Sequence, residues 1–153
     1  MDYGRDLEMS NAMFYFQAAW TTLKNGNFII TGGSYYYDSK KSNRVLEIDL
    51  NQWRVDQLAD MITGRKRHAI CNFKNVIYVF AGDAQKGGSA PSEKFQFGPV
   101  WEEIAPPSAQ WGVSCITHKD HIYISGWPSA NIDIYDPVTN SYEVWSDVVA
   151  PMS

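Results

Sequence analysis

Short apolar segments that end in small residues recur three times along the chain. They are Phe28–Gly33, Val76–Gly82 and Ile122–Trp127, and each places β-branched and aromatic residues before a glycine. Apolar runs of this length between turn residues are typical of buried strands. The segments follow one another at intervals of about 45 to 50 residues. The pattern therefore indicates one structural unit that is used three times.

Each apolar segment lies among further strand-like segments that are joined by short polar turns. Asn25-Gly26 separates the first two segments of the first unit, and Asn-Gly favours a tight hairpin turn. Each unit is therefore predicted to be a four-stranded antiparallel meander. The predicted strands are 19–23, 28–31, 44–50 and 53–58, then 67–73, 76–81, 93–97 and 101–104, then 111–117, 122–125, 132–135 and 142–145.

Four strands in a repeat of 40 to 50 residues are typical of a β-propeller blade. We therefore expect an all-β protein with three four-stranded antiparallel blades, at residues 14–60, 61–106 and 107–153. The third blade includes the start of a link to a next blade. Residues 1–13 lack a clear period and are assigned to an N-terminal extension or cloning remnant, with Met13 as a candidate native start.

At these positions the chain resembles the kelch repeat. That family has a second strand ending in a double glycine, an aromatic residue at the fourth strand and an arginine upstream. The corresponding residues here are Gly32-Gly33, Ala81-Gly82 and Gly126-Trp127 for the glycines, Trp53, Trp101 and Tyr142 for the aromatic, and Phe16, Arg65 and Gln110 upstream. The resemblance implies that the tryptophans, Trp53 and Trp101, pack between neighbouring blades.

Three blades cannot close a ring, because the outer two would leave exposed faces. Residues 146–152 resemble the link at 57–61, so the chain stops where a fourth blade would begin. The protein is then a fragment of a longer propeller, or a partner supplies the missing blades, or two copies complete a six-bladed ring. We expect self-association of two half-rings.

Charge and composition narrow the classes of function. A net charge of −4 argues against a general nucleic-acid binder, and no apolar stretch approaches the roughly 18 residues of a membrane span. Cys71 and Cys115 lie in apolar runs without metal-ligand spacing and are read as reduced core residues of a cytoplasmic or nuclear protein. His118 and His121 span a predicted turn. All three histidines, including His68, are placed near the strand ends opposite the loops expected to bind a ligand, which are residues 33–43, 59–66, 82–92, 105–111 and 127–130. We expect no metal and no cofactor.

The kelch resemblance implies that ligands bind to the loops, because the strands are used for packing. We therefore expect a non-enzymatic module that binds a protein or peptide. Tyr, Trp and Arg dominate binding hot spots. The predicted contacts are Tyr35, Tyr36, Tyr37, Arg44, Arg65, Lys66, Trp111 and Trp127.

Three alternatives stay open at this point. Tyr35, Tyr36 and Tyr37 can cover a blade edge without binding a ligand. Some kelch propellers are sugar oxidases or mutarotases, although no copper-binding Tyr-Cys-His set is found in this sequence. The chain can also be a structural protein whose ligand is its own copy. Kelch chains often carry a BTB or F-box domain, and nothing here resembles either one.

Overall fold

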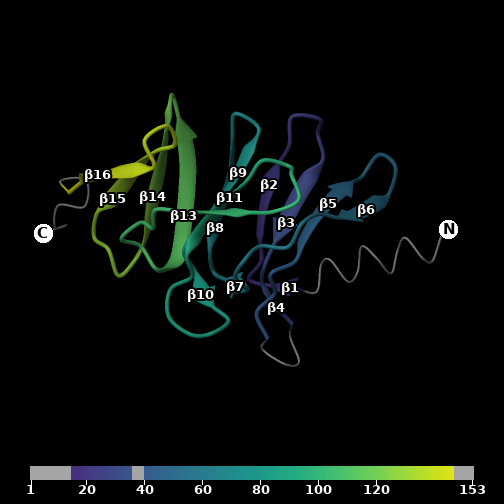
Figure 1. Ribbon diagram of the computed structural model, residues 1–153, viewed down its shortest axis with the longest axis horizontal. Helices are drawn as coiled ribbons and strands as arrows, with labels where there is room; N and C mark the ends of the chain where they lie inside the picture. The colour runs from purple at the N-terminus through teal and green to yellow at the C-terminus, as the bar shows by residue number, and fades with distance from the viewer. Residues whose placement is uncertain (1–14, 36–39, 147–153) are drawn as a thin grey trace, which may run out of the picture.

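The computed structural model describes residues 15–35 and 40–146, which form three four-stranded antiparallel sheets without a helix (Figure 1). The N-terminal sheet contains β2 (Ala19–Thr22), β3 (Phe28–Thr31), β5 (Val45–Asp49) and β6 (Arg54–Gln57). The middle sheet contains β8 (Ala69–Phe73), β9 (Val76–Phe80), β11 (Ser92–Phe95) and β12 (Glu102–Ile104). The C-terminal sheet contains β13 (Trp111–His118), β14 (His121–Trp127), β15 (Ile132–Asp136) and β16 (Ser141–Trp145).

The predicted all-β class and the four-stranded antiparallel sheets are confirmed. Four further strands of two residues each were not predicted, because so short a segment has no measurable period. They form two ladders, β1 (Tyr15–Phe16) with β4 (Ser34–Tyr35), and β7 (Arg65–Lys66) with β10 (Asp83–Ala84).

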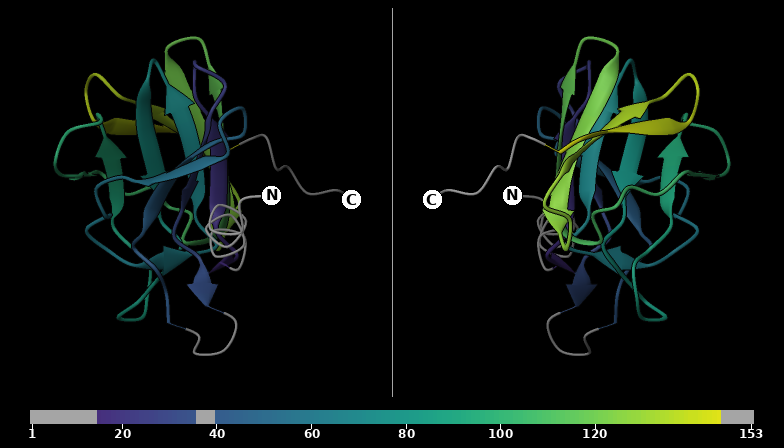
Figure 2. Two further views of the ribbon diagram at one scale, coloured as in Figure 1. Left: turned by 90° about the vertical axis from the view of Figure 1, so that its right-hand side faces the viewer. Right: turned by 90° about the vertical axis from the view of Figure 1, so that its left-hand side faces the viewer.

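The three sheets lie side by side, with the first strands β2, β8 and β13 as neighbours (Figure 1). We call the end with the β2–β3, β8–β9 and β13–β14 turns the turn end, and the opposite end, with the two short ladders, the loop end (Figures 1 and 2). Every loop that follows the second strand of a sheet therefore lies at the loop end.

Apolar side chains fill both junctions between the sheets. Ile29 and Val45 of the N-terminal sheet pack with Ile77 and Val79 of the middle sheet. At the second junction a cluster of buried residues includes Tyr78, Phe80, Ile122, Ile124 and Tyr135. These clusters bury the faces that separate meanders would expose, so each sheet is stabilised by its neighbour.

The two cysteines lie at the second junction, and both are free. Cys71 is buried and Cys115 is half-buried. The pKa of Cys71 is raised above its usual value, mainly by a hydrogen bond with Cys115 and secondly by burial. This placement agrees with the prediction of reduced core cysteines.

An aromatic side chain fastens each of the two links between sheets. The Trp101 Nε1 donates a hydrogen bond of 2.8 Å to the carbonyl of Ala59 in the first link. The Tyr142 hydroxyl donates one of 2.6 Å to the carbonyl of Ala105 in the second link. Tyr142 stands in the C-terminal sheet where Trp101 stands in the middle sheet, as predicted. Both side chains donate a hydrogen bond to a carbonyl of the link that comes from the preceding sheet.

Trp53 does not follow this pattern, and its predicted packing between neighbours is wrong. It is 53% exposed in the β5–β6 turn. The N-terminal sheet has no preceding four-stranded sheet among the described residues. Among the described residues, the Trp53 ring therefore lacks the link contact that Trp101 makes with Ala59.

A third-strand carboxylate also holds each link. Glu93 accepts hydrogen bonds from the backbone N–H groups of Ile62 (2.7 Å) and Thr63 (3.1 Å). Asp133 accepts one of 2.6 Å from the backbone N–H of Ser108. These carboxylates satisfy part-buried backbone donors of the links and so fix the path of the chain between sheets.

Arg65 pairs with the Glu93 carboxylate that holds the first link. Its side chain is fully buried, forms an ion pair with Glu93, and donates a hydrogen bond of 2.9 Å to the carbonyl of Ala81. Burial lowers the pKa of Arg65, whereas the Glu93 charge raises it. Removing either partner would leave the other charge buried without compensation.

We predict that Glu93→Gln lowers the free energy of unfolding by about 3 to 5 kcal/mol, because it leaves the Arg65 charge unpaired in the interior. Urea denaturation followed by fluorescence measures the change. Glu102→Gln is the matched control, because Glu102 forms an exposed pair with Lys94 at 3.6 Å and its loss should cost at most about 1 kcal/mol. Equal losses in both variants would contradict the structural role of the buried pair.

Candidate binding surface at the loop end

Two tryptophans form an aromatic surface at the loop end of the C-terminal sheet. Trp111 begins β13 and Trp127 ends β14, and the two residues are directly opposite in the antiparallel pairing. Their rings stack with centroids 4.9 Å apart and an interplanar angle of 24°. Trp127 is 64% exposed and Trp111 is half-buried. The pair therefore presents a wide apolar surface to solvent.

Backbone irregularity next to Trp111 helps to place this pair. The β13–β14 register shifts between Trp111 and Ser114, and Gly112 has a φ of +57°. A glycine adopts this left-handed conformation without the steric cost that a side chain adds. The Gln110 N–H donates to the Trp127 carbonyl at 2.8 Å. The bulge thus holds the start of β13 against the end of β14.

The loop after Trp127 is tied down by a small hydrogen-bonded cluster. The Ser108 hydroxyl lies 3.1 Å from the Ser129 hydroxyl and donates to the Asp133 carboxylate at 2.6 Å. The Ser129 N–H donates to the carbonyl of Gly126 at 3.0 Å. A surface fixed in this way loses little conformational entropy when it binds.

The loops of the other two sheets are tied to each other. The Lys41 side chain donates to the carbonyl of Ala84 at 2.9 Å, and the Lys41 backbone N–H donates to the Gln85 side chain. Arg67 makes two hydrogen bonds of 2.9 Å to the Asp83 carboxylate. The loop after β3 and the loop after β9 are therefore neighbours in space.

Arg44, Lys66 and Tyr35 are placed outside the tryptophan stack. Arg44 is exposed just before β5, and Lys66 is half-buried in β7. Tyr35 pairs with Tyr15 through the β1–β4 ladder. Tyr36 and Tyr37 lie outside the described residues. Of the eight predicted contacts, the stack brings together Trp111 and Trp127.

Arg65 requires a correction. Its side chain has no exposed surface, so it cannot touch a partner on this face. The upstream position that suggested a ligand contact instead carries the buried pair with Glu93. Sequence alone did not distinguish the two roles, because the arginine and its carboxylate are 28 residues apart.

His68 is a buried residue at the loop end, so its predicted place at the opposite end is wrong. Its Nε2 shares a hydrogen bond of 2.8 Å with the Thr31 hydroxyl. An added Cβ at Gly32 or Gly82 would lie 2.7 Å from His68 atoms, and both glycines have positive φ. The glycines that suggested the repeat thus leave room for this imidazole.

The surroundings of His68 disfavour its charged form. Burial, followed in size by the Arg65 charge, lowers its pKa from 6.5 to about 3, although a hydrogen bond with Thr31 opposes the shift. The His68 Nδ1 and Arg65 Nε atoms are buried without a hydrogen-bond partner among the described residues. His68 is therefore neutral in the folded protein near pH 7.

Two searches of the described ranges give negative findings. No group of three or more His, Cys, Asp or Glu side chains in residues 15–35 and 40–146 is arranged to hold a metal ion. The same ranges contain no helix with the length and hydropathy of a transmembrane segment.

No family model matches the chain, and no curated protein matches it.

We predict that stability falls as pH falls through the titration of His68. The unfolded chain binds a proton near pH 6.5, whereas the folded protein binds it only near pH 3, so the unfolded state gains protons first. From pH 8 to pH 5 this group should reduce the free energy of unfolding by about 2 kcal/mol. Urea denaturation of the wild type and His68→Gln at both pH values measures the change. The same pH slope in both proteins would rule out His68 as its source.

Proposed function

We propose that the protein is a segment of a kelch-type propeller that binds a protein or peptide through its loop end. The three sheets are the blades in this proposal. The repeated use of a fourth-strand aromatic donor, Trp101 and Tyr142, and of a third-strand carboxylate, Glu93 and Asp133, supports a common repeat.

The observation that carries the binding function is the exposed Trp111–Trp127 stack. Tryptophan is enriched among residues whose truncation most weakens protein complexes, because its large ring excludes water at little cost in rotamer entropy. A pair held by β13, β14 and the Ser129 loop offers such a ring in a fixed position.

We also propose that two copies associate through the open face of the C-terminal sheet (Figure 2). Ile116, Tyr123 and Ile134 are in register across this face, and Ile116 is 68% exposed. The corresponding pair of the middle sheet, Cys71 and Tyr78, is covered by the C-terminal sheet. A shallow depression of about 150 Å³ lies beside Ile116 and Tyr123 on this face, where a side chain of the second copy could insert.

The arrangement of the two copies follows from which faces are open. This pairing differs from the six-bladed ring expected from the sequence, which stays a prediction and would also use the outer face of the N-terminal sheet. On that outer face Ile30, Leu46 and Ile48 are at most 8% exposed, whereas Ile116 on the C-terminal sheet is 68% exposed. We therefore favour a pair in which two C-terminal sheets face each other, because the same patch then covers itself by two-fold symmetry.

We predict that Trp127→Ala weakens peptide binding by on the order of 30-fold, as expected when a hot-spot ring is lost. Peptides selected from a random displayed library on the wild type are titrated by fluorescence polarisation. Trp53→Ala is the matched control, because Trp53 is similarly exposed but lies at the turn end. If no peptide is selected, or if both variants bind as the wild type does, the loop-end function is wrong.

We predict that wild-type protein has twice the 17.4 kDa chain mass in light scattering, and that Ile116→Glu is a folded monomer. A charge at the centre of the apolar face would be buried without a partner in the pair. Val138→Glu, at a residue that is 93% exposed in the β15–β16 turn, should leave the mass unchanged. A monomeric wild type would contradict the pairing.

A further inference from the structure

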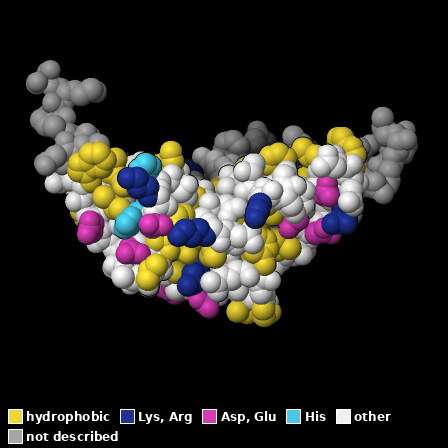
Figure 3. All heavy atoms as spheres, turned by 90° about the horizontal axis from the view of Figure 1, so that it is seen from above, with side chains coloured by type: hydrophobic (Ala, Val, Ile, Leu, Met, Phe, Trp, Pro, Cys, Tyr) yellow, Lys and Arg dark blue, Asp and Glu magenta, His cyan; other side chains and the backbone are white. Residues whose placement is uncertain are grey.

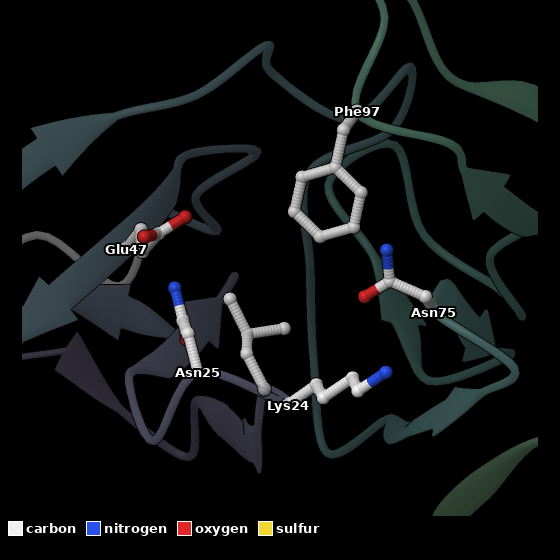
Figure 4. Close-up of a pocket in the computed structure, with 6 residues that line it drawn as sticks. Lys24, Asn25, Glu47, Asn75 and Phe97 are labelled. Carbon is white, nitrogen blue, oxygen red and sulfur yellow. The ribbon is translucent and has the colours of Figure 1, made fainter.

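A groove at the turn end, away from the tryptophan pair, separates the N-terminal and middle sheets (Figure 4). Its volume is about 400 Å³, within the range of small-molecule sites. The β2–β3 turn and β5 form one wall, and the β8–β9 turn and the segment after β11 form the other. The lining residues are Leu23, Lys24, Asn25, Glu47, Asn75 and Phe97.

Phe97 occupies this groove at a cost to the backbone. The predicted strand 93–97 stops at Phe95, because Phe97 has a φ of +60°. A bulky residue rarely adopts this conformation, and the adjacent Gly98 would adopt it without strain. The Phe97 ring contacts Phe95 at 5.1 Å and is 39% exposed. Backbone strain that leaves an aromatic ring open to solvent indicates a use for that ring.

Polar groups with unused hydrogen-bonding capacity line the same groove as the Phe97 ring. The Asn75 amide and the Lys24 ammonium have no hydrogen-bond or ion-pair partner among the described residues. Asn25 Oδ1 accepts from the Asn27 N–H at 3.0 Å, and Glu47 Oε2 accepts from the Asn27 side chain at 2.8 Å. The Asn25 amide nitrogen and the second Glu47 oxygen remain available, and Figure 4 shows these side chains around the same space.

The equivalent groove between the middle and C-terminal sheets provides an internal comparison. Its volume is about 610 Å³, but its charged groups already have partners. Lys74 pairs with Asp120 at 3.0 Å, and His121 lies 4.0 Å from Asp136. The segment after β15 contributes Val138 to this groove, whereas the segment after β11 contributes Phe97 to the first. The exposed aromatic ring of Phe97 therefore distinguishes the first groove.

The lining chemistry suits a neutral ligand that carries several hydroxyl groups. A hydroxyl both donates and accepts, and so does the amide of Asn75. Lys24 and Glu47 carry opposite charges, and the turn end as a whole mixes both signs (Figure 3). The Phe97 ring would cover the apolar face of a sugar ring while the amides and the carboxylate reach its hydroxyl groups. We propose that this groove binds a neutral sugar unit, independently of the loop-end function.

Saturation-transfer NMR and isothermal titration with five neutral sugars test the proposal: methyl glucoside, methyl galactoside, N-acetylglucosamine, lactose and maltose. At least one sugar should bind the wild type saturably, with a dissociation constant in the millimolar range. Phe97→Ala should weaken that binding on the order of tenfold, because it removes the aromatic contact. Phe97→Tyr keeps the ring and should bind as the wild type does.

Asn75→Gly is a second variant that separates binding from folding. Asn75 has a φ of +62°, which glycine also adopts, so the turn is kept while the amide is lost. This variant should lose sugar binding severalfold with unchanged circular dichroism. Val138→Ala in the neighbouring groove is the matched control and should bind normally.

The proposal is overturned if no probe sugar binds saturably at concentrations on the order of 50 mM, well above usual small-ligand dissociation constants. It is also overturned if Phe97→Ala and Asn75→Gly both bind as the wild type does. Stronger binding of the blocked tripeptide acetyl-Ala-Phe-Ala-amide than of any sugar would instead assign the groove to a peptide. Trp127→Ala should retain sugar binding, so failure at one end is distinguishable from failure at the other.

Discussion

The buried pair between Arg65 and Glu93 determines how the first two sheets meet. Glu93 receives the backbone of the link at Ile62 and Thr63, and Arg65 reaches the carbonyl of Ala81 at the end of β9. A charge pair of this kind is costly to desolvate and is retained only when its geometry is well satisfied. Once it forms, it sets the path of the chain from the N-terminal sheet into β7 and β8. His68 is held neutral beside it.

The second link uses the same plan with weaker chemistry. Asp133 receives Ser108, and Tyr142 reaches Ala105, but Gln110 stands where Arg65 stands in the first link. Gln110 is followed directly by Trp111, whose half-buried ring stacks on the exposed Trp127. The tryptophan pair therefore begins where the second link ends.

The positions of the strands could be predicted because strands are indicated by short runs of apolar or alternating residues between turn residues, and these runs are visible in the sequence. Val76–Gly82 was predicted as a buried strand with a terminal glycine, and the structure has β9 at Val76–Phe80. The roles of individual side chains were less predictable. Trp101 and Trp53 occupy equivalent places beside the fourth strand, but in the described part of the chain Trp101 bonds a link carbonyl and Trp53 is exposed. The predicted surface residue Arg65 is buried, and Phe97 was read as an ordinary strand residue.

The all-β class, the four-stranded meanders and the turns between them follow from the order of residues, because alternation, β-branched residues and turn residues act over a few positions. Which charged, aromatic and imidazole groups meet depends instead on how the sheets pack. Those contacts join residues tens of positions apart, as Arg65 joins Glu93 and Thr31 joins His68. The energy of each contact depends on how deeply it is buried and on which other segment packs against it. Neither can be read from a few neighbouring residues.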